Sequence, residues 1–366
     1  MNLLIAPNAF KGTIEADEAA EIIGNAILGK MPDANLTVCP IADGGDGTCF
    51  LLGKALNLEQ VFEIALDPLG RPMQGFYFLD TGQKTAYLDV STVSGIKSLK
   101  PNERNPWITS TFGTGELIKK AADTGTEHII LGLGGSATVD LGIGILRGLG
   151  FLFLDEKGRE IPVFSEGFIS KIRFIQSPIP KPNLKFTCLC DVNNHFFGPS
   201  GAIPVFGPQK GLEMEDLEKF EKYCSKALEL MAKKSGKQLA DRESFGAAGG
   251  IAFGLSFFFP MEIEMGATWF FEKVGIESKI KSADIIITGE GKFDSQSASG
   301  KGSFELLQLA KKHDKETVLI TSGNGGKDSG FDRVIQLPEL DFSSKGFIDI
   351  AKMNLFNAVK SEMWNF

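Results

Sequence analysis

Five short segments combine carboxylates or lysines with glycines, and each follows a run of apolar residues. Residues 42–48 read Ala-Asp-Gly-Gly-Asp-Gly-Thr. Gly44 and Gly45 would let the backbone approach a ligand closely and point its N–H groups at an anion. The carboxylates of Asp43 and Asp46 could hold Mg²⁺ or accept a hydroxyl proton. The simpler interpretation is a turn in which Asp46 caps a helix, but the density of these features favours a binding role.

Two other segments place a charged residue directly after an apolar run. Residues 6–13 carry Lys11 beside a glycine, which would bring an ammonium group and a bare backbone to an anion; the alternative is an ordinary turn with an exposed lysine. Residues 190–194 read Cys-Asp-Val-Asn-Asn. Asp191 is therefore a candidate general base or metal ligand, or only a turn residue, and Asn193 is a candidate substrate contact. Lys210 forms a further Lys-Gly pair with Gly211.

Residues 132–140, Gly-Leu-Gly-Gly-Ser-Ala-Thr-Val-Asp, open a glycine-rich helical stretch. N–H groups at the start of a helix favour phosphate oxygens, so Gly134, Gly135 and Ser136 are candidate phosphate contacts. The segment also fits the dinucleotide fingerprint G-x-G-x-x-A, with Asp155 near the expected position of a ribose-binding acid. A dinucleotide-dependent oxidoreductase that uses Gly132–Asp155 is thus an alternative, although a six-residue match is weak.

The last segments, 288–296 and 299–302, mix acids, bases and glycines as a site for metal-bound phosphates would. The candidates here are Gly289, Glu290, Lys292 and Lys301 for phosphate or ribose, and Asp294 for a metal. The segment is not a Walker A loop, because glycine follows Lys301 where serine or threonine is needed.

Phosphoryl transfer would use all five segments. It needs backbone donors, cations on the phosphates, Mg²⁺ held by carboxylates and one base for the acceptor hydroxyl. Either Asp43 or Asp191 is the candidate base, and whichever of the two is not the base would lie nearer the metal. Lys11 is a candidate catalytic cation. The chain has no G-x-S-x-G motif, so a hydrolytic triad is not evident.

Alternating strands and helices must position these segments. Apolar runs predict strands at 3–6, 36–42, 61–66, 74–79, 85–90, 128–133, 151–154, 185–190, 284–288, 317–321 and 334–337. Helical spacing predicts helices at 15–28, 48–56, 115–122, 214–234, 304–312 and 346–363. Strands and helices alternate at both ends of the chain, whereas strands follow one another near 61–90. This predicts an α/β protein with a discontinuous doubly wound domain, 1–64 and 266–366, and an inserted α/β domain with a mixed sheet, 65–265.

Composition narrows the class further. The chain has 366 residues and a net charge of −8, which argues against a general nucleic-acid partner. The five cysteines are scattered, as expected for reduced thiols, and the three histidines show no zinc spacing. The start of the chain lacks the features of a signal peptide, and the longest uncharged run is too short and too broken for a membrane span. We expect a cytoplasmic protein without a membrane partner.

Taken in order, the segments resemble the glycerate kinase family of the bacterial type II kind. The matching motifs are Phe-Lys-Gly at 10–12, Ala-Asp-Gly-Gly at 42–45, Gly-Thr-Gly-Glu-Leu-Ile at 113–118, Gly-Gly-Ser-Ala-Thr at 134–138, Val-Phe-Gly-Pro-Gln-Lys-Gly at 205–211 and Gly-Ala-Ala-Gly-Gly at 246–250. The resemblance implies a kinase that phosphorylates glycerate with ATP and Mg²⁺; 2-phosphoglycerate is the favoured product, and 3-phosphoglycerate is the alternative. It also implies two α/β domains, one of them Rossmann-like, with the active site in the cleft between them, and it is compatible with a homodimer.

The chain departs from the family pattern at several of these positions. The family usually has aspartate and serine at Asn8 and Ala9, glutamate at Asp46 and asparagine at Val139. Losing a carboxylate at position 8 and an amide at position 139 would weaken metal or substrate binding. A non-catalytic homologue that binds glycerate is therefore a second alternative.

Overall fold

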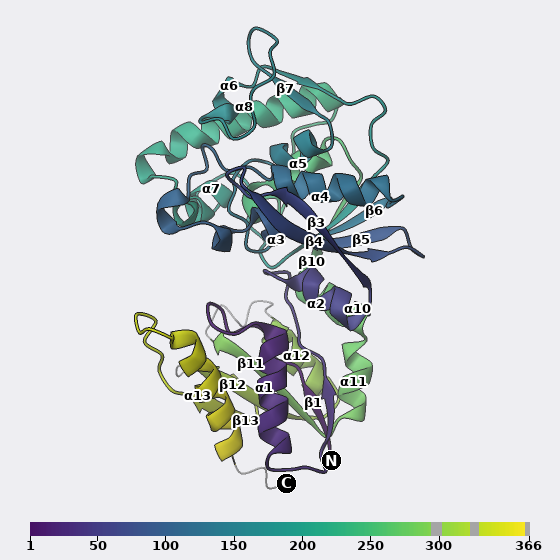
Figure 1. The fold of residues 1–366 in the computed structure, drawn as a ribbon, viewed down its shortest axis with the longest axis vertical. Helices are drawn as coiled ribbons and strands as arrows, with labels where there is room; N and C mark the ends of the chain where they lie inside the picture. The colour runs from purple at the N-terminus through teal and green to yellow at the C-terminus, as the bar shows by residue number, and fades with distance from the viewer. Residues whose placement is uncertain (294–301, 323–328, 363–366) are drawn as a thin grey trace. The chain divides into compact units, whose positions relative to one another are not determined.

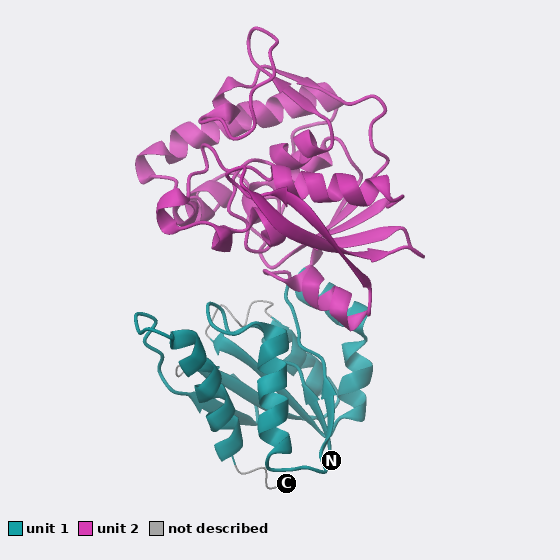
Figure 2. Ribbon diagram, in the orientation of Figure 1, with its two compact units in different colours: residues 1–43, 266–366 teal, residues 44–265 magenta. Residues whose placement is uncertain are grey.

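The structure is a computed structural model that describes residues 1–293, 302–322 and 329–362. The chain divides into two compact units (Figure 2). Unit 1 comprises residues 1–43 and 266–366, and unit 2 comprises residues 44–265. In the part of the chain that the structure describes, no helix is both long and apolar enough to cross a membrane.

Within its described residues, unit 1 contains a five-stranded sheet whose strands are all parallel. The strand order is β13-β12-β11-β1-β2, formed by β1 (Asn2–Ile5), β2 (Asn35–Val38), β11 (Ile285–Lys292), β12 (Glu316–Ser322) and β13 (Arg333–Leu337). Counted along the unit, this is the 2-1-3-4-5 order of a doubly wound fold. The order reverses between β1 and β11, so the crevice beyond their carboxyl ends is where a ligand is expected.

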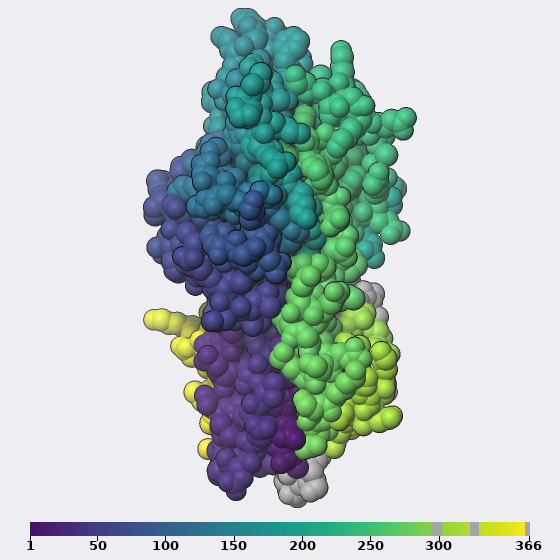
Figure 3. All heavy atoms as spheres, turned by 90° about the vertical axis from the view of Figure 1, so that its right-hand side faces the viewer, coloured from purple at the N-terminus to yellow at the C-terminus, as the bar shows by residue number. Residues whose placement is uncertain are grey.

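Helices cover both faces of this sheet (Figure 1). Helices α1 (Ala16–Leu28) and α13 (Phe347–Ser361) pack together on one face, where small and branched residues of α1 meet Leu355 and Val359. Helices α10 (Gly266–Val274), α11 (Ile276–Ser282) and α12 (Gly302–Lys312) contact one another. Right-handed crossovers place α12 on the face opposite α1, because β1 to β2 and β11 to β12 run in opposite directions across the sheet. Figure 3 shows the N-terminal and C-terminal segments of unit 1 side by side at its surface.

Unit 2, all of whose residues the structure describes, is built on a six-stranded mixed sheet in the order β10-β9-β6-β5-β4-β3. Its strands are β3 (Glu59–Leu66), β4 (Pro72–Asp80), β5 (Thr85–Asp89), β6 (His128–Gly132), β9 (Lys185–Cys190) and β10 (Met261–Met265). The pairs β3–β4 and β4–β5 are antiparallel, and β5, β6, β9 and β10 are parallel. A separate antiparallel pair joins β7 (Leu152–Leu154) to β8 (Phe174–Gln176).

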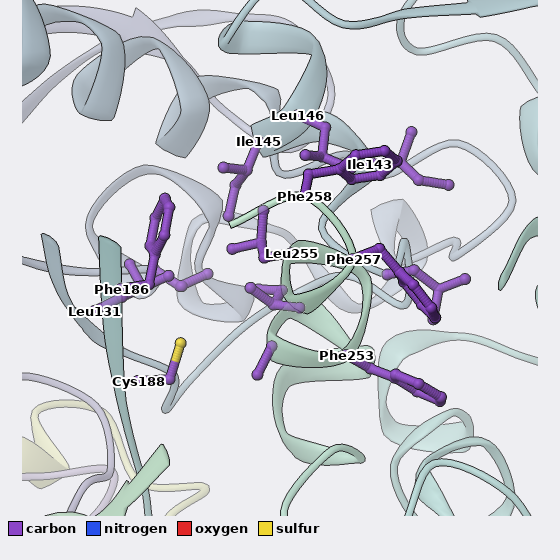
Figure 4. Close-up of a cluster of buried hydrophobic side chains, with 14 of the residues drawn as sticks. Leu131, Ile143, Ile145, Leu146, Phe186, Cys188, Phe253, Leu255, Phe257 and Phe258 are labelled. Carbon is purple, nitrogen blue, oxygen red and sulfur yellow. The ribbon is translucent and has the colours of Figure 1, made fainter. Parts of the chain in front are cut away.

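The helices of unit 2 enclose one large core. They are α2 (Thr48–Ala55), α3 (Ser91–Ser94), α4 (Phe112–Asp123), α5 (Ile143–Gly148), α6 (Phe168–Lys171), α7 (Ala202–Phe206), α8 (Leu217–Ser235) and α9 (Ile251–Ser256). Figure 4 shows Leu131 of β6 and Phe186 of β9 in one buried cluster with Leu146 of α5 and Leu255 of α9. This packing fixes the carboxyl ends of β6 and β9, from which two of the candidate segments emerge.

The first boundary between the units lies earlier than the sequence predicted. The sequence placed it after residue 64, whereas residues 44–64 belong to unit 2. The reason is that β3 pairs with β4 along its whole length, and the ring of Phe50 in α2 packs against Phe76 and Phe78 of β4. The second boundary falls between residues 265 and 266, at the position that the sequence suggested.

Candidate functional site

A cavity of about 470 Å³ lies at the carboxyl ends of the strands of unit 1. Asn8 follows β1, Asp43 follows β2, and Glu290 lies near the end of β11; all three line the cavity. This is the point at which the strand order reverses, so unit 1 offers a ligand site where doubly wound folds commonly have one.

The side chains of Asn8 and Asp43 are joined inside this cavity. Asn8 Nδ2 donates a hydrogen bond of 2.9 Å to Asp43 Oδ2, and Asn8 Oδ1 accepts one of 2.8 Å from the backbone N–H of Ala9. Asn8 is 8% exposed and Asp43 is 4% exposed. The backbone N–H of Asn8 also donates to Gly289 O at 2.8 Å, which ties β1 to β11. Asn8 therefore fixes the orientation of a nearly buried carboxylate.

Positive groups surround the same position. Lys11 and Lys292 line the cavity and are exposed. Helix α12 begins at Gly302, where an added Cβ would lie 3.5 Å from Asn8 Nδ2 and 3.7 Å from Asp43 Cβ. The first N–H groups of a helix favour anions. The start of α12 therefore adds to the attraction that the two ammonium groups exert on an anion.

The residues of unit 1 can accommodate Mg²⁺. The described residues contain no cluster of three or more His, Cys, Asp or Glu side chains arranged to hold a metal. Mg²⁺, however, commonly uses one or two carboxylates and completes its shell with water and substrate phosphates. Asp43 and Glu290 are both buried and line one cavity, which fits that requirement, whereas Asn8 supplies an amide instead of another carboxylate. Asp294 and Lys301 lie outside the described residues.

In unit 2, three candidate segments meet at the ends of the parallel strands β6 and β9. A Cβ added to Gly44, whose φ is +94°, would lie 2.4 Å from Cys190 O. One added to Gly134 would lie 2.1 Å from the carbonyl carbon of Gly45. Only glycine permits such approaches, so segments 42–48, 132–140 and 190–194 are brought together by backbone contact.

Asp46 contacts the second of these segments and does not cap a helix. The N-cap residue of α2 is Gly47, in the left-handed conformation. As a glycine it has no side chain that could cap the helix. Asp46 instead forms an ion pair of 2.8 Å with Lys97, and a Cβ on Gly135 would lie 3.0 Å from Asp46 Cγ. The interpretation of Asp46 as a cap is therefore wrong, and Lys97 is a neighbour that the sequence did not reveal.

The start of α2 is held by a different aspartate, Asp89, at the end of β5. Its two carboxylate oxygens accept hydrogen bonds of 3.0 Å from the backbone N–H groups of Cys49 and Phe50. Burial raises the pKa of Asp89 to about 7, although these two hydrogen bonds act in the opposite direction. Asp89 lies inside the strand predicted at 85–90 and not after it, so the strand-end pattern did not single it out.

Lys210 is buried, and its side chain is hydrogen-bonded to segment 132–140. Its ammonium donates hydrogen bonds of 2.8 Å to Ser136 Oγ and to Thr138 O. Burial lowers the pKa of Lys210 to about 7, and the carboxylate of Asp140 partly counteracts this. Asp140 in turn accepts 2.8 Å hydrogen bonds from the N–H and the hydroxyl of Thr111. The network positions Ser136; a phosphate contact by Lys210 itself stays a prediction.

Asp191 and Asn193 lie beyond the end of β9. Asp191 is partly exposed, and its backbone nitrogen would lie 3.0 Å from a Cβ on Gly44. Asn193 is exposed, and its carbonyl oxygen accepts a hydrogen bond of 3.2 Å from Ser244 N. Val139 is fully buried in the core of unit 2.

The dinucleotide interpretation of Gly132–Asp155 is not supported. It requires Asp155 to follow a strand beside β6 in the same parallel sheet. β7, which precedes Asp155, belongs instead to the separate β7–β8 pair. The carboxylate of Asp155 accepts hydrogen bonds from the backbone of Lys157 and Arg159, so it closes a local turn.

Comparisons with known proteins agree with this geometry. Residues 3–363 match the model of the glycerate kinase family. The glycerate kinase of Bacillus subtilis (strain 168) is 37% identical over 332 residues, which cover 90% of this chain and 86% of that protein. The glycerate 2-kinase of Escherichia coli (strain K12) is 31% identical over 361 residues, which cover 95% and 94%.

A solved structure extends the likeness to the fold. A crystal structure assigned as glycerate kinase 2 from Salmonella typhimurium LT2 has a TM-score of 0.81 and 31% identity, and the match covers 98% of this chain and 96% of that one. The predicted α/β class, with one doubly wound unit and one mixed sheet, is confirmed. By sequence and by structure, this chain belongs to the glycerate kinase family.

Proposed function

We propose that the chain is a phosphotransferase that phosphorylates glycerate on a hydroxyl group, with ATP as donor and Mg²⁺ as the metal. The family match over residues 3–363 carries the proposal, because it spans both units. The chemistry of the sites supports it, since glycine-rich backbone, lysines and carboxylates gather at strand ends in each unit.

The donor side is assigned to unit 1. Asp43 and Glu290 would hold Mg²⁺, which would supply positive charge for the phosphate oxygens. Lys11 and Lys292 line the same cavity and would pair with the remaining phosphate oxygens. Asn8 keeps the Asp43 carboxylate turned toward its ligand through the 2.9 Å hydrogen bond.

The acceptor hydroxyl needs a base, and the candidates remain Asp191 and Asp43. We favour Asp191 because it is partly exposed beside Gly44, whereas Asp43 is nearly buried and fixed by Asn8. Glycerate also carries a carboxylate. The backbone at Gly134 and Gly135, with the Ser136 hydroxyl, is the proposed anion contact in unit 2.

A coupled assay of ADP release tests the activity. The wild-type chain should release ADP only when glycerate, ATP and Mg²⁺ are all present. Asp191→Asn should lower kcat by about 10²–10⁴-fold, since general bases contribute that much. Asp155→Asn is the matched control, because it removes a carboxylate from a turn in the same unit and should change kcat less than about twofold. A folded wild type that releases no ADP with glycerate would refute the proposal.

Finer features of the proposal have separate tests. The name of the E. coli relative supports 2-phosphoglycerate as the product, and the phosphorus–proton coupling pattern of the product distinguishes it from 3-phosphoglycerate. The five buried free thiols support a cytoplasmic location, because a reducing compartment preserves them. Sedimentation would show whether the chain of 39.6 kDa forms a homodimer.

A further inference from the structure

Part of the lining of the unit 1 cavity is apolar, and we call these side chains the apolar wall. Phe10 and Ile14, which follow β1, are each 3% exposed. Three more apolar side chains, Leu337, Leu340 and Phe342, line the same cavity from β13 and the loop beyond it. These side chains come from two distant parts of the sequence, so the apolar wall is a product of the fold.

The rest of the cavity lining includes polar and charged groups. It contains the Asn8–Asp43 pair, Glu290 and the two lysines, Lys11 and Lys292. Cavities that bind organic ligands are typically apolar with a few converging polar groups, and about 470 Å³ lies in their usual size range. A ligand with a flat apolar part and anionic groups matches this lining.

The two proposed substrates differ in this respect. Glycerate has three carbons, each bearing oxygen, and gains little from an apolar wall. The adenine of ATP has two π-faces that stack on aromatic side chains, and its triphosphate suits the lysines and the carboxylate-bound metal. Asn354 of α13 also lines the cavity, and its amide could both donate to and accept from the adenine edge.

Building on the proposed kinase function, we infer that the apolar wall of the unit 1 cavity binds the adenine base, with Phe342 as the stacking residue and Asn354 as the contact for the edge of the base. Unit 1 is then the nucleotide-binding unit, and the apolar wall does not contribute to the affinity for glycerate.

Equilibrium binding to the full chain tests this inference. Titration calorimetry would compare ATP with inorganic triphosphate, which has no base, in the wild type and in Phe342→Ala. Phe342 is 62% exposed, so the substitution should leave the fold intact. Loss of stacking should raise the Kd for ATP about 5- to 100-fold, and leave both the Kd for triphosphate and the KM for glycerate within twofold. Asn354→Ala should also weaken ATP and spare triphosphate.

Phe62→Ala is the matched control, because Phe62 is 55% exposed and lies in unit 2; it should leave the Kd for ATP unchanged. An unchanged Kd for ATP in both Phe342→Ala and Asn354→Ala would overturn the inference, and a raised KM for glycerate instead would place glycerate in this cavity. These results would leave the kinase function standing if the wild type still released ADP with glycerate. Conversely, ATP binding that is lost in Phe342→Ala would support the adenine site even if the wild type were inactive.

Discussion

Replacing Asn8 by alanine tests how much the chain depends on a fixed Asp43 carboxylate. The substitution removes the 2.9 Å hydrogen bond to Asp43 Oδ2, and water replaces it poorly because Asp43 is only 4% exposed. Hydrogen bonds to charged groups contribute about 1.5–3 kcal/mol. If that stabilisation is needed in the transition state, kcat/KM should fall by roughly 10- to 100-fold, since about 1.4 kcal/mol corresponds to a factor of ten. The coupled ADP assay, run across a range of Mg²⁺ concentrations, measures the loss.

Asn35→Ala is the matched control for this experiment. Asn35 donates a hydrogen bond of the same length, 2.9 Å, from Nδ2 to Asn2 Oδ1, but that pair is exposed and lies outside the cavity. Its kcat/KM should stay within about twofold of wild type. The reasoning is refuted if Asn8→Ala, with an unchanged Tm, keeps kcat/KM within threefold of wild type.

Asn8→Asp gives a second and opposite perturbation at the same position. It would place a second carboxylate oxygen near 2.9 Å from Asp43 Oδ2. Two carboxylates at this distance tend to share one proton, so the acid limb of the pH–rate profile should move to higher pH. High Mg²⁺ should reverse part of the shift, because the metal replaces the shared proton. A profile that coincides with that of the wild type would count against a role for this pair.

Three further predictions concern unit 2. Gly44→Ala should destabilise the chain more than Gly47→Ala, as read from Tm, because both have positive φ but only the first would place Cβ within 2.4 Å of Cys190 O; equal Tm losses would contradict the close contact. The pKa of Asp89 is raised to about 7 from 3.8, so its contribution to the free energy of unfolding is full below pH 4 and is lost as the pH rises through 7. Asp89→Asn should abolish this pH dependence in urea titrations, and an identical slope in the variant would contradict it. The pKa of Lys210 is lowered to about 7 from 10.5. Between these two pH values the unfolded chain binds more protons than the folded chain, so the free energy of unfolding should rise with pH over this range. Lys210→Met should lack the rise, and its persistence would show that the lysine is not buried as described.

Local sequence patterns predicted the elements of unit 1 well. The strands of a parallel sheet are buried on both faces and read as short apolar runs, such as those at 3–6 and 317–321, which became β1 and β12. The predicted strand at 36–42 was too long, since β2 ends at Val38, although the N–H groups of Cys39 and Ile41 still donate to Ile5 O and Pro7 O. The strand β10, Met-Glu-Ile-Glu-Met, was missed, although its residues alternate and Pro260 separates it from α9.

The candidate site was predictable only as a set of residues. Strand-end acids and glycines indicated Asp43, Asp191 and the segment at 134–136 because the carboxyl ends of parallel strands share one edge of a sheet. Their partners could not be predicted, since the Asn8–Asp43 bond joins positions 35 residues apart. Nor does a sequence show burial, so the sequence did not reveal that the fold encloses Lys210.

The apolar wall of the unit 1 cavity was also hidden from the sequence. Phe342 and Leu340 lie in a loop, where apolar residues carry no periodic signal, and only the fold of the sheet brings them to the cavity that Phe10 also lines. Long-range topology, and not local pattern, decides which loops line the same cavity.

Phosphorus NMR of a mixture of the full chain with glycerate, ATP and Mg²⁺ is the most direct test of glycerate phosphorylation. We predict that a phosphomonoester signal of phosphoglycerate, split by the proton on carbon 2, grows in step with the signals of ADP. Signals of ATP alone, or of ADP with inorganic phosphate and no phosphomonoester, would contradict the account.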